Sequence, residues 1–113
     1  MWIYLNNAFV SCVEHKHDPS SLLIRTRKKG DLEELFPGVS VQDSVEDFDY
    51  RFRATLPRGE VSEELARRVM QIDYPKFKNS IREIDRKMAY TKCWSKMLDW
   101  QLDSANKDHP GDK

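Results

Sequence analysis

The sequence IDYPKFKNS, residues 72–80, joins two stretches of helical spacing through a single proline, Pro75. Proline lacks an amide hydrogen and disfavours helical backbone at the preceding residue, so a first helix is expected to end here. Proline also suits the first turn of a helix, and the spacing predicts a second helix of about 28 residues from this point. We therefore expect the chain to reverse at Pro75. The apolar residues that this reversal would pack together are Leu65, Val69, Ile72, Ile81, Ile84 and Met88.

Aromatic and polar side chains crowd this break. Tyr74 and Phe77 flank the proline, Lys76 and Lys78 alternate with them, and a polar pair follows at 79–80. Such a mixture is typical of a recognition corner and equally of a well-packed joint between helices. The corner residues Tyr74, Lys76, Phe77 and Lys78 are therefore candidates for a binding surface.

Three short strands are predicted upstream of the break, at residues 2–5, 8–16 and 22–27. Each is rich in strand-forming residues or alternates between apolar and polar positions. Asn6-Asn7 predicts a hairpin between the first two strands, because asparagine tolerates the positive φ that such turns require. The sequence Asp18-Pro19-Ser20-Ser21 predicts the next turn.

A short helix and a fourth strand follow. Residues 31–36 are predicted to form the helix, with Asp31 as its N-cap and Pro37-Gly38 as its end. Residues 39–47 are expected to form an exposed polar loop. The strand at residues 48–56 has the cleanest alternation in the sequence. One face carries Tyr50, Phe52, Ala54 and Leu56, and the other carries Asp49, Arg51, Arg53 and Thr55.

Two helical segments complete the pattern, one opening at Ser62 and a longer one after Pro75. The second half of the long helix is apolar over much of its circumference, and such a helix usually contacts more than one surface. From Asp103 the chain is polar and is expected to be disordered. The apolar residues of this half are Tyr90, Cys93, Trp94, Met97, Leu98 and Trp100.

These elements predict an α+β protein in the order strand, strand, strand, short helix, strand, helix, long helix. Short connections make the first three strands an antiparallel meander. An antiparallel sheet of about four strands, covered on one face by helices, buries the apolar sides of both layers. One domain is expected over residues 1–102, followed by a disordered polar tail over residues 103–113.

Composition limits the classes of function. The 113 residues include 19 basic and 19 acidic side chains, so the net charge is zero and nucleic-acid binding would need a local basic patch. Cys12 and Cys93 lack the closely spaced partners of a zinc site, and both are expected to be reduced residues in or near the core. The first residues resemble neither a leader nor an anchor, so a cytoplasmic protein without a membrane partner is expected.

Four arginines are the first candidate for recognition. Arg25 and Arg27 alternate on the third strand, and Arg51 and Arg53 alternate on the fourth. If these strands are neighbours, all four lie on the sheet face away from the helices and would attract phosphates or acidic side chains. The alternative is a solvated face on which nearby carboxylates neutralise the arginines. The two readings differ in whether the arginines cluster without balancing carboxylates.

No pattern predicts a catalytic residue, a metal site or a cofactor. His15 and His17 would share a strand face, but no third ligand accompanies them. The acidic pairs 33–34 and 63–64 are adjacent residues, which do not face one another on a helix and suit its N-terminal turn. The sequence therefore favours a binding protein over an enzyme.

The last helix interleaves its aromatic residues with three lysines between residues 87 and 96. Bases of single-stranded nucleic acid stack on such rings, but the same spacing suits a helix that buries its aromatics while lysines reach water. Trp94 and Met97 are expected in the core. Tyr90 and Trp100 lie off that stripe, so a homodimer or another hydrophobic contact is expected there.

Five segments carry a resemblance to known proteins: MWIYLNNAFVS (1–11), LLIRTRKKGDLEELFPG (22–38), DYRFRA (49–54), IDYPKFKNS (72–80) and AYTKCWSKM (89–97). Together they resemble a family of small single-domain proteins encoded in bacterial genomes, including mobile and prophage regions. The resemblance implies architecture and context but no catalytic residue. Such proteins are similar in type to phage-borne inhibitors, anti-CRISPR proteins among them. Many such inhibitors are acidic mimics of nucleic acid, and this neutral chain departs from that pattern.

The function expected from the sequence is therefore a non-enzymatic protein-binding module or inhibitor. It would act by stoichiometric binding to a bacterial protein complex. The alternative is a small nucleic-acid-binding protein or ribonuclease-like enzyme that uses the basic sheet face, with Arg25, Arg27, Arg51, Arg53 and His15.

Overall fold

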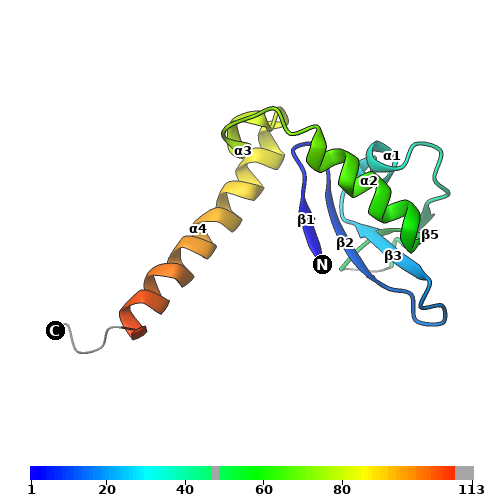
Figure 1. Cartoon of the computed structure of the whole chain (residues 1–113), viewed down its shortest axis with the longest axis horizontal. Helices are drawn as coiled ribbons and strands as arrows, with labels where there is room; N and C mark the ends of the chain where they lie inside the picture. Colours follow the sequence, from blue (N-terminus) through cyan, green and yellow to red (C-terminus); the bar gives the residue numbers. More distant parts are fainter. Residues whose placement is uncertain (47–48, 109–113) are drawn as a thin grey trace. The chain divides into compact units, whose positions relative to one another are not determined.

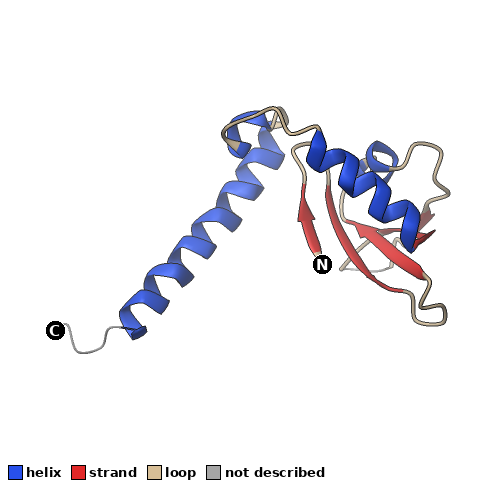
Figure 2. Cartoon of the chain, viewed as in Figure 1, coloured by secondary structure: helices blue, strands red, loops and turns tan. Residues whose placement is uncertain are grey.

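The computed structural model describes residues 1–46 and 49–108 of the chain. It divides into two compact units, Met1–Pro75 and Lys76–Lys113, and each is treated by itself. The structure confirms the α+β class, with an antiparallel sheet and helices (Figure 1, Figure 2). The hydrophobic core of the predicted 1–102 domain lies entirely within the first unit.

The first unit contains a five-stranded antiparallel sheet in the order β1-β2-β3-β5-β4. As predicted, the first three strands form a meander. The hairpin connection at Asn6-Asn7 is confirmed, because the Leu5 N–H donates to the Ala8 carbonyl at 2.8 Å across it, but neither asparagine has the positive φ on which the prediction rested. The strands are β1 (Trp2–Tyr4), β2 (Phe9–Glu14), β3 (Ser21–Thr26), β4 (Gln42–Asp43) and β5 (Phe52–Pro57).

The strand β4 lies in the segment that the sequence analysis assigned to a loop. Gln42 and Asp43 pair with Arg53 and Phe52 of β5, at the edge of the sheet. A sheet edge leaves backbone donors and acceptors unpaired, and even two residues in extended conformation satisfy some of them. Two polar residues carry no alternation, so the sequence had no signal for this strand.

One face of the sheet is covered by two helices, α1 (Asp31–Leu35) and α2 (Arg58–Met70). The cross-strand pair Ile24 and Ala54 lies on this face, as do Val10 and Cys12 on β2. Leu32 of α1 and Val61 of α2 pack against them in one continuous core. Fully burying a large aliphatic side chain contributes about 1.5–3 kcal/mol, so this layer holds the first unit together.

The start of α1 differs from the prediction. Gly30, with φ +97°, is the N-cap, because glycine alone adopts the left-handed region without steric cost. Asp31 is the first helical residue and is buried. Its carboxylate accepts a hydrogen bond from the Phe9 N–H at 3.0 Å, which ties the helix to the start of β2.

The helix α2 begins at Arg58, four residues before the predicted Ser62. Pro57 ends β5 and is also the N-cap, with the extended ψ of 139° that is typical of a residue just before a helix. Ser62 lies within the first turns, where its hydroxyl donates to the Arg58 carbonyl at 2.9 Å. The serine was therefore mistaken for a cap because it can serve either role.

The second unit contains α3 (Phe77–Ser80) and α4 (Ile84–Asp108). The break at Pro75 is confirmed, because α2 ends at Met70 and no helix runs through Tyr74 to Lys76. The single long helix predicted from Pro75 is wrong. The chain leaves helical conformation at Ile81, with φ −83° and ψ +117°, and α4 starts three residues later.

Acidic residues mark this new start. The Asp85 carboxylate accepts the Arg86 N–H at 2.9 Å, and negative charge is favourable at a helix N-terminus. At the other end, α4 continues to Asp108, so the tail predicted to be disordered from Asp103 is helical over residues 103–108. Residues 109–113 lie outside the described residues. The predicted packing of Val69 and Ile72 against Ile84 and Met88 joins the two units and stays a prediction.

None of the helices in residues 1–46 and 49–108 is long and apolar enough to cross a membrane.

Candidate functional site

The four arginines come together beside the sheet face opposite α1 and α2. Arg25 of β3 lies directly opposite Arg53 of β5. Ser11 of β2 lies on the other side of Arg25, and its hydroxyl accepts a hydrogen bond from Arg25 Nη2 at 2.9 Å. Arg27 follows β3 and Arg51 precedes β5. We call Arg25, Arg27, Arg51 and Arg53 the arginine face.

Carboxylates neutralise two members of the arginine face. Arg27 Nη2 pairs with Asp49 Oδ1 at 3.0 Å. Arg51 holds both oxygens of Asp43, with Nε–Oδ1 at 2.7 Å and Nη2–Oδ2 at 3.2 Å. This hydrogen-bonded pair lowers the pKa of Asp43 and raises the pKa of Arg51. Asp43 comes from β4, so the strand that the sequence did not predict supplies the balancing charge.

Tyr50 contacts three of the four arginines, two through its ring and one through its carbonyl. The guanidinium carbons of Arg25 and Arg27 lie 4.5 and 4.2 Å from the centre of its ring, within the range of cation–π attraction. Arg53 Nε donates to the Tyr50 carbonyl at 3.2 Å. Tyr50 is 3% exposed, yet it is not part of the core with Phe52. Its predicted place beside Phe52 is therefore wrong, because the alternation starts only where β5 begins.

These contacts give the arginine face a structural role. Arg27 and Arg51 are held in ion pairs, Arg25 and again Arg27 pack on the ring of the buried Tyr50, and Arg53 donates to its carbonyl. Exposed ion pairs contribute little to stability, but they hold each guanidinium in a fixed direction. The solvated-face alternative describes Arg27 and Arg51 better than the free basic cluster does.

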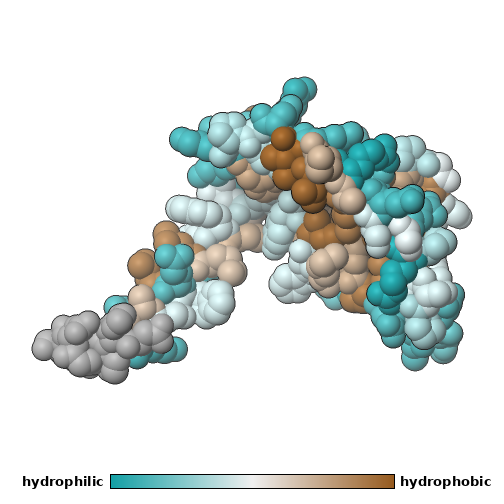
Figure 3. All heavy atoms as spheres, in the orientation of Figure 1, coloured by the Kyte–Doolittle hydropathy of each residue, from teal (hydrophilic) through white to brown (hydrophobic). Residues whose placement is uncertain are grey.

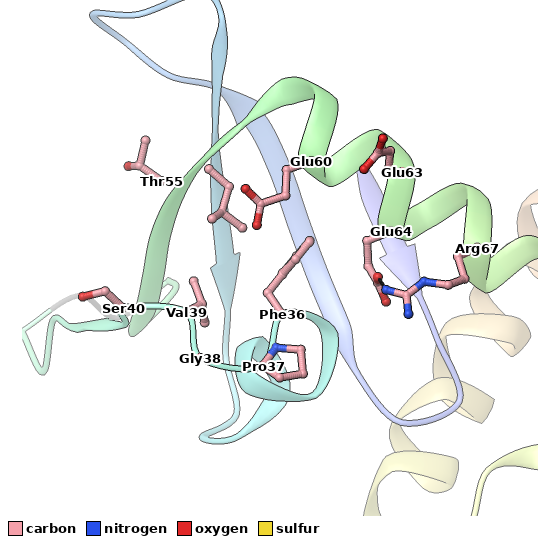
Figure 4. A pocket seen from close by; sticks show the side chains of 11 residues that line it. Phe36, Pro37, Gly38, Val39, Ser40, Thr55, Glu60, Glu63, Glu64 and Arg67 are labelled. Carbon is pink, nitrogen blue, oxygen red and sulfur yellow. Dashed lines mark hydrogen bonds and ion pairs between the residues drawn. The ribbon is translucent and has the colours of Figure 1, made fainter.

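A groove of about 670 Å³ lies between the end of α1, the β5 strand and α2 (Figure 4). Its lining includes the apolar side chains of Phe36 and Leu56 and the carboxylates of Glu60 and Glu63 of α2. The neighbouring Glu64 is buried and pairs with Arg68 Nε at 3.0 Å and with Arg67. The adjacent carboxylates 63 and 64 thus point to different environments, as expected for neighbours on a helix.

The polar groups that line the groove are hydroxyls and charged side chains. Its lining contains the hydroxyls of Ser40 and Thr55, the carboxylates of α2 and the guanidinium of Arg67. Across the described part of the chain, no three potential ligands gather into a metal site. His15 and His17 contact one another, with the His17 N–H donating to His15 Nδ1 at 3.2 Å, in an exposed turn.

The corner after Pro75 is a packed joint in the second unit. Phe77 stacks on Tyr90 with ring centres 5.9 Å apart and an interplanar angle of 13°. Arg86 is buried beside them, donating to the Tyr90 hydroxyl at 3.3 Å and to Glu83 at 3.0 Å. Tyr90 was expected to lie off the core stripe, but this stack buries it. Of the other corner residues, Lys76 is exposed and Tyr74 is half-buried.

The prediction for the middle of α4 is wrong. Trp94 and Met97 were expected in the core, but they are 59% and 57% exposed. Among the described residues, the one ring contact of Trp94 is with Lys78, whose Nζ lies 5.1 Å from the centre of the ring. The short α3 reaches Tyr90 but leaves the following turns of α4 uncovered. Cys93, also expected near the core, is exposed, whereas Cys12 is buried as predicted and burial raises its pKa.

Trp94, Met97 and Trp100 succeed one another at three-residue spacing and so share one side of α4. We call these three residues the tryptophan face. A shallow groove of about 590 Å³ runs along it. Figure 3 shows hydrophobic residues on the surface of this helix. The groove is lined by Trp94, Met97, Leu98, Trp100, Gln101, Ser104 and Ala105, none of which is charged.

No protein-family model, no curated protein and no solved structure matches this chain. The tryptophan face rests on the structure alone, and the sequence had marked only Trp100 of its three residues as exposed. A signal was present, because residues 90–105 are uncharged except at 92, 96, 99 and 103, all on one side of the helix.

Proposed function

We propose that this protein is a non-enzymatic protein-binding module whose contact surface is the tryptophan face of α4. The exposure of Trp94, Met97 and Trp100 carries this proposal, since each is more than half exposed on a helix of 25 residues. Large apolar side chains that lie together at a surface mark interaction sites, and tryptophan is enriched among the residues that dominate binding energy.

The chemistry of the face defines the partner. Its lining is apolar with small uncharged polar groups, so a partner must offer an apolar groove without charges that would be desolvated on contact. An exposed helix that presents neighbouring large residues is the form in which helices dock into such grooves. The partner class implied by the family resemblance is a bacterial protein complex, which this module would inhibit by covering a site on it.

The arrangement elsewhere supports binding more than catalysis. Among the described residues, the arginine face is occupied by Asp43, Asp49 and Tyr50. A ribonuclease-like enzyme would need an acid–base pair beside free cations. His15 lies in an exposed turn with His17 and has no such arrangement around it in the part of the chain that the structure describes.

Trp100→Lys tests the proposal, with Trp2→Lys as its matched control. Both tryptophans are similarly exposed, at 65% and 66%, but Trp2 lies on β1 of the sheet. We expect one protein to co-purify in stoichiometric amount with the wild type and with Trp2→Lys. Trp100→Lys should lose it, and titration of the purified partner should show binding weakened by about 2 kcal/mol or more, as for a central interface residue.

Equal binding by the two variants and the wild type would contradict the proposal, and so would binding lost equally from both. Circular dichroism of each variant checks that α4 remains helical.

A further inference from the structure

A second apolar line runs along α4, on the side away from Trp100. It consists of residues spaced alternately by three and four, the spacing of a helix–helix seam: Met88, Thr91, Ser95, Leu98, Leu102 and Ala105. Met88 and Leu102 are 60% and 54% exposed. Trp100 lies two positions from both Leu98 and Leu102, which places it roughly 160° around the helix from this seam.

All charges between residues 90 and 105 lie in one stripe that borders the seam. The stripe reads Lys92, Lys96, Asp99, Asp103, at spacings of four, three and four. If the stripe is read backwards, from Asp103 to Lys92, and each charge is given the opposite sign, the same order of charges and the same spacings result. The midpoint of this symmetry lies between Met97 and Leu98.

The order of these charges is unfavourable within α4 itself. Lys92 and Lys96 are a like-charged pair at i, i+4, and so are Asp99 and Asp103. Like charges at this spacing repel, whereas alternating signs would have stabilised the helix. A helix with two basic and then two acidic positions is matched instead by a neighbour that runs the other way.

The seam has the same symmetry in the sizes of its residues. In two copies of the seam that run antiparallel, Met88 of one helix faces Ala105 of the other, Thr91 faces Leu102 and Ser95 faces Leu98. Each layer pairs one long apolar side chain with one short side chain, and such alternation lets facing helices interdigitate. The midpoints of the two patterns differ by one residue, so Lys92 and Asp103 are offset by two residues along the axis, about 3 Å, which a lysine side chain spans.

We infer that α4 pairs with α4 of a second copy of this chain in antiparallel orientation, along the seam. Lys92 then meets Asp103 of the second copy, and Lys96 meets its Asp99. A two-fold symmetric interface requires a self-complementary surface, and both charge and size supply it here. A parallel pair would place the two charge stripes on opposite sides of the contact, where they cannot pair, and would set methionine against methionine. The zero net charge of the chain adds no general repulsion between copies.

The seam shares Leu98 and Ala105 with the groove along the tryptophan face, whereas Trp100 lies on the far side of the helix from the seam. Dimerisation would therefore leave Trp100 available to a partner. In helix–helix pairs of this kind, the charges that flank the seam decide which helices pair and in which orientation.

Charge exchange along the stripe tests the inference. The acidic variant combines Lys92→Asp with Lys96→Asp, and the basic variant combines Asp99→Lys with Asp103→Lys. We expect the wild type to be dimeric at micromolar concentration by sedimentation, and each variant alone to dimerise about tenfold or more weakly. An equimolar mixture of the two should form a heterodimer. The fourfold exchange, which carries all four changes, should restore the homodimer.

Orientation is measured with a spin label at Lys107→Cys in a Cys93→Ser background. Antiparallel helices in this register place the two labels about 30 Å apart along the axis. A parallel pair would bring them to about 10 Å, the distance between packed helix axes. Trp100→Lys serves as the control and should remain dimeric, because Trp100 lies outside the seam.

A monomeric wild type, a fourfold exchange that fails to restore the dimer while remaining helical, or labels at the shorter distance would each overturn the inference. Loss of the dimer in Trp100→Lys would overturn it as well. Partner binding that fails while the charge pattern of dimerisation holds would count against the proposed function alone.

Discussion

The sheet unit and the helix α4 use their charged and apolar residues in opposite ways. In the sheet unit, the arginines that resemble a recognition surface are held by Asp43, Asp49 and Tyr50. In α4, the residues that resemble a core, Trp94 and Met97, are exposed. The comparison teaches that residue type alone does not separate structure from recognition. The number of elements that pack around a residue does.

Packing explains the difference. The sheet face under α1 and α2 is closed by helices, and on the other face the guanidinium groups of Arg25 and Arg27 pack on the ring of the buried Tyr50. The second unit consists of one long helix and a four-residue helix. A four-residue helix can bury only a short part of a long one, here at Phe77 and Tyr90, so within the second unit the remaining apolar surface of α4 has no helix packed on it.

The largest expected contrast is in stability. Ile24→Ala removes a side chain that is 0% exposed in the centre of the sheet, and should destabilise the first unit by about 2–5 kcal/mol because a cavity remains. Leu102→Ala removes a side chain that is 54% exposed on α4, and alanine favours helix, so a purified monomer should change little. Chemical denaturation followed by circular dichroism measures both.

Similar losses in the two variants would break the comparison, because they would mean that Leu102 is part of a core. A loss in Leu102→Ala that grows with protein concentration would instead sharpen it, since dimerisation stabilises the folded state by mass action.

The sequence predicted the sheet unit well and α4 poorly, for one physical reason. Alternation along β5 reports a half-buried strand directly, and Phe52 and Ala54 are buried as expected. A helical apolar stripe reports only that some surface covers it. The prediction placed Trp94 on the buried stripe and Tyr90 off it, although residues four apart share one side of a helix. Which of the two is buried depended on α3, a helix too short to show in the sequence. The strand β4, two polar residues long, was invisible in the same way.

A smaller expected effect concerns Asp43. The hydrogen bond from Arg51 holds the pKa of the Asp43 carboxyl below its ordinary value of about 3.9. A lowered native pKa contributes stability above the unfolded-state pKa, and this contribution is lost as the pH falls through the native value. In Arg51→Gln, the Asp43 pKa measured by NMR titration should rise toward its ordinary value, and the stability should depend less on pH in the acid range.

Asp18 is the internal control for that titration. Its pKa is also lowered, but by hydrogen bonds from Ser20 and Ser21, so Arg51→Gln should leave it unchanged. If Asp43 keeps its low pKa without Arg51, then Arg51 does not hold this carboxylate. The arginine face would then have a free cation, and the contrast between the two regions would weaken.

The smallest effect is expected in nucleic-acid binding. If the guanidinium groups of the arginine face are held within the protein, they release few counterions when a phosphate backbone approaches, and binding should be weak and nearly independent of salt. Arg51→Glu should then leave the titration of single-stranded nucleic acid unchanged at two salt concentrations, with Lys16→Glu, an exposed change near β2, as the matched charge control. Tight wild-type binding whose salt dependence flattens only in Arg51→Glu would return the arginine face to recognition. The charged residues of the sheet unit would then bind nucleic acid, as the apolar residues of α4 are proposed to bind a protein partner.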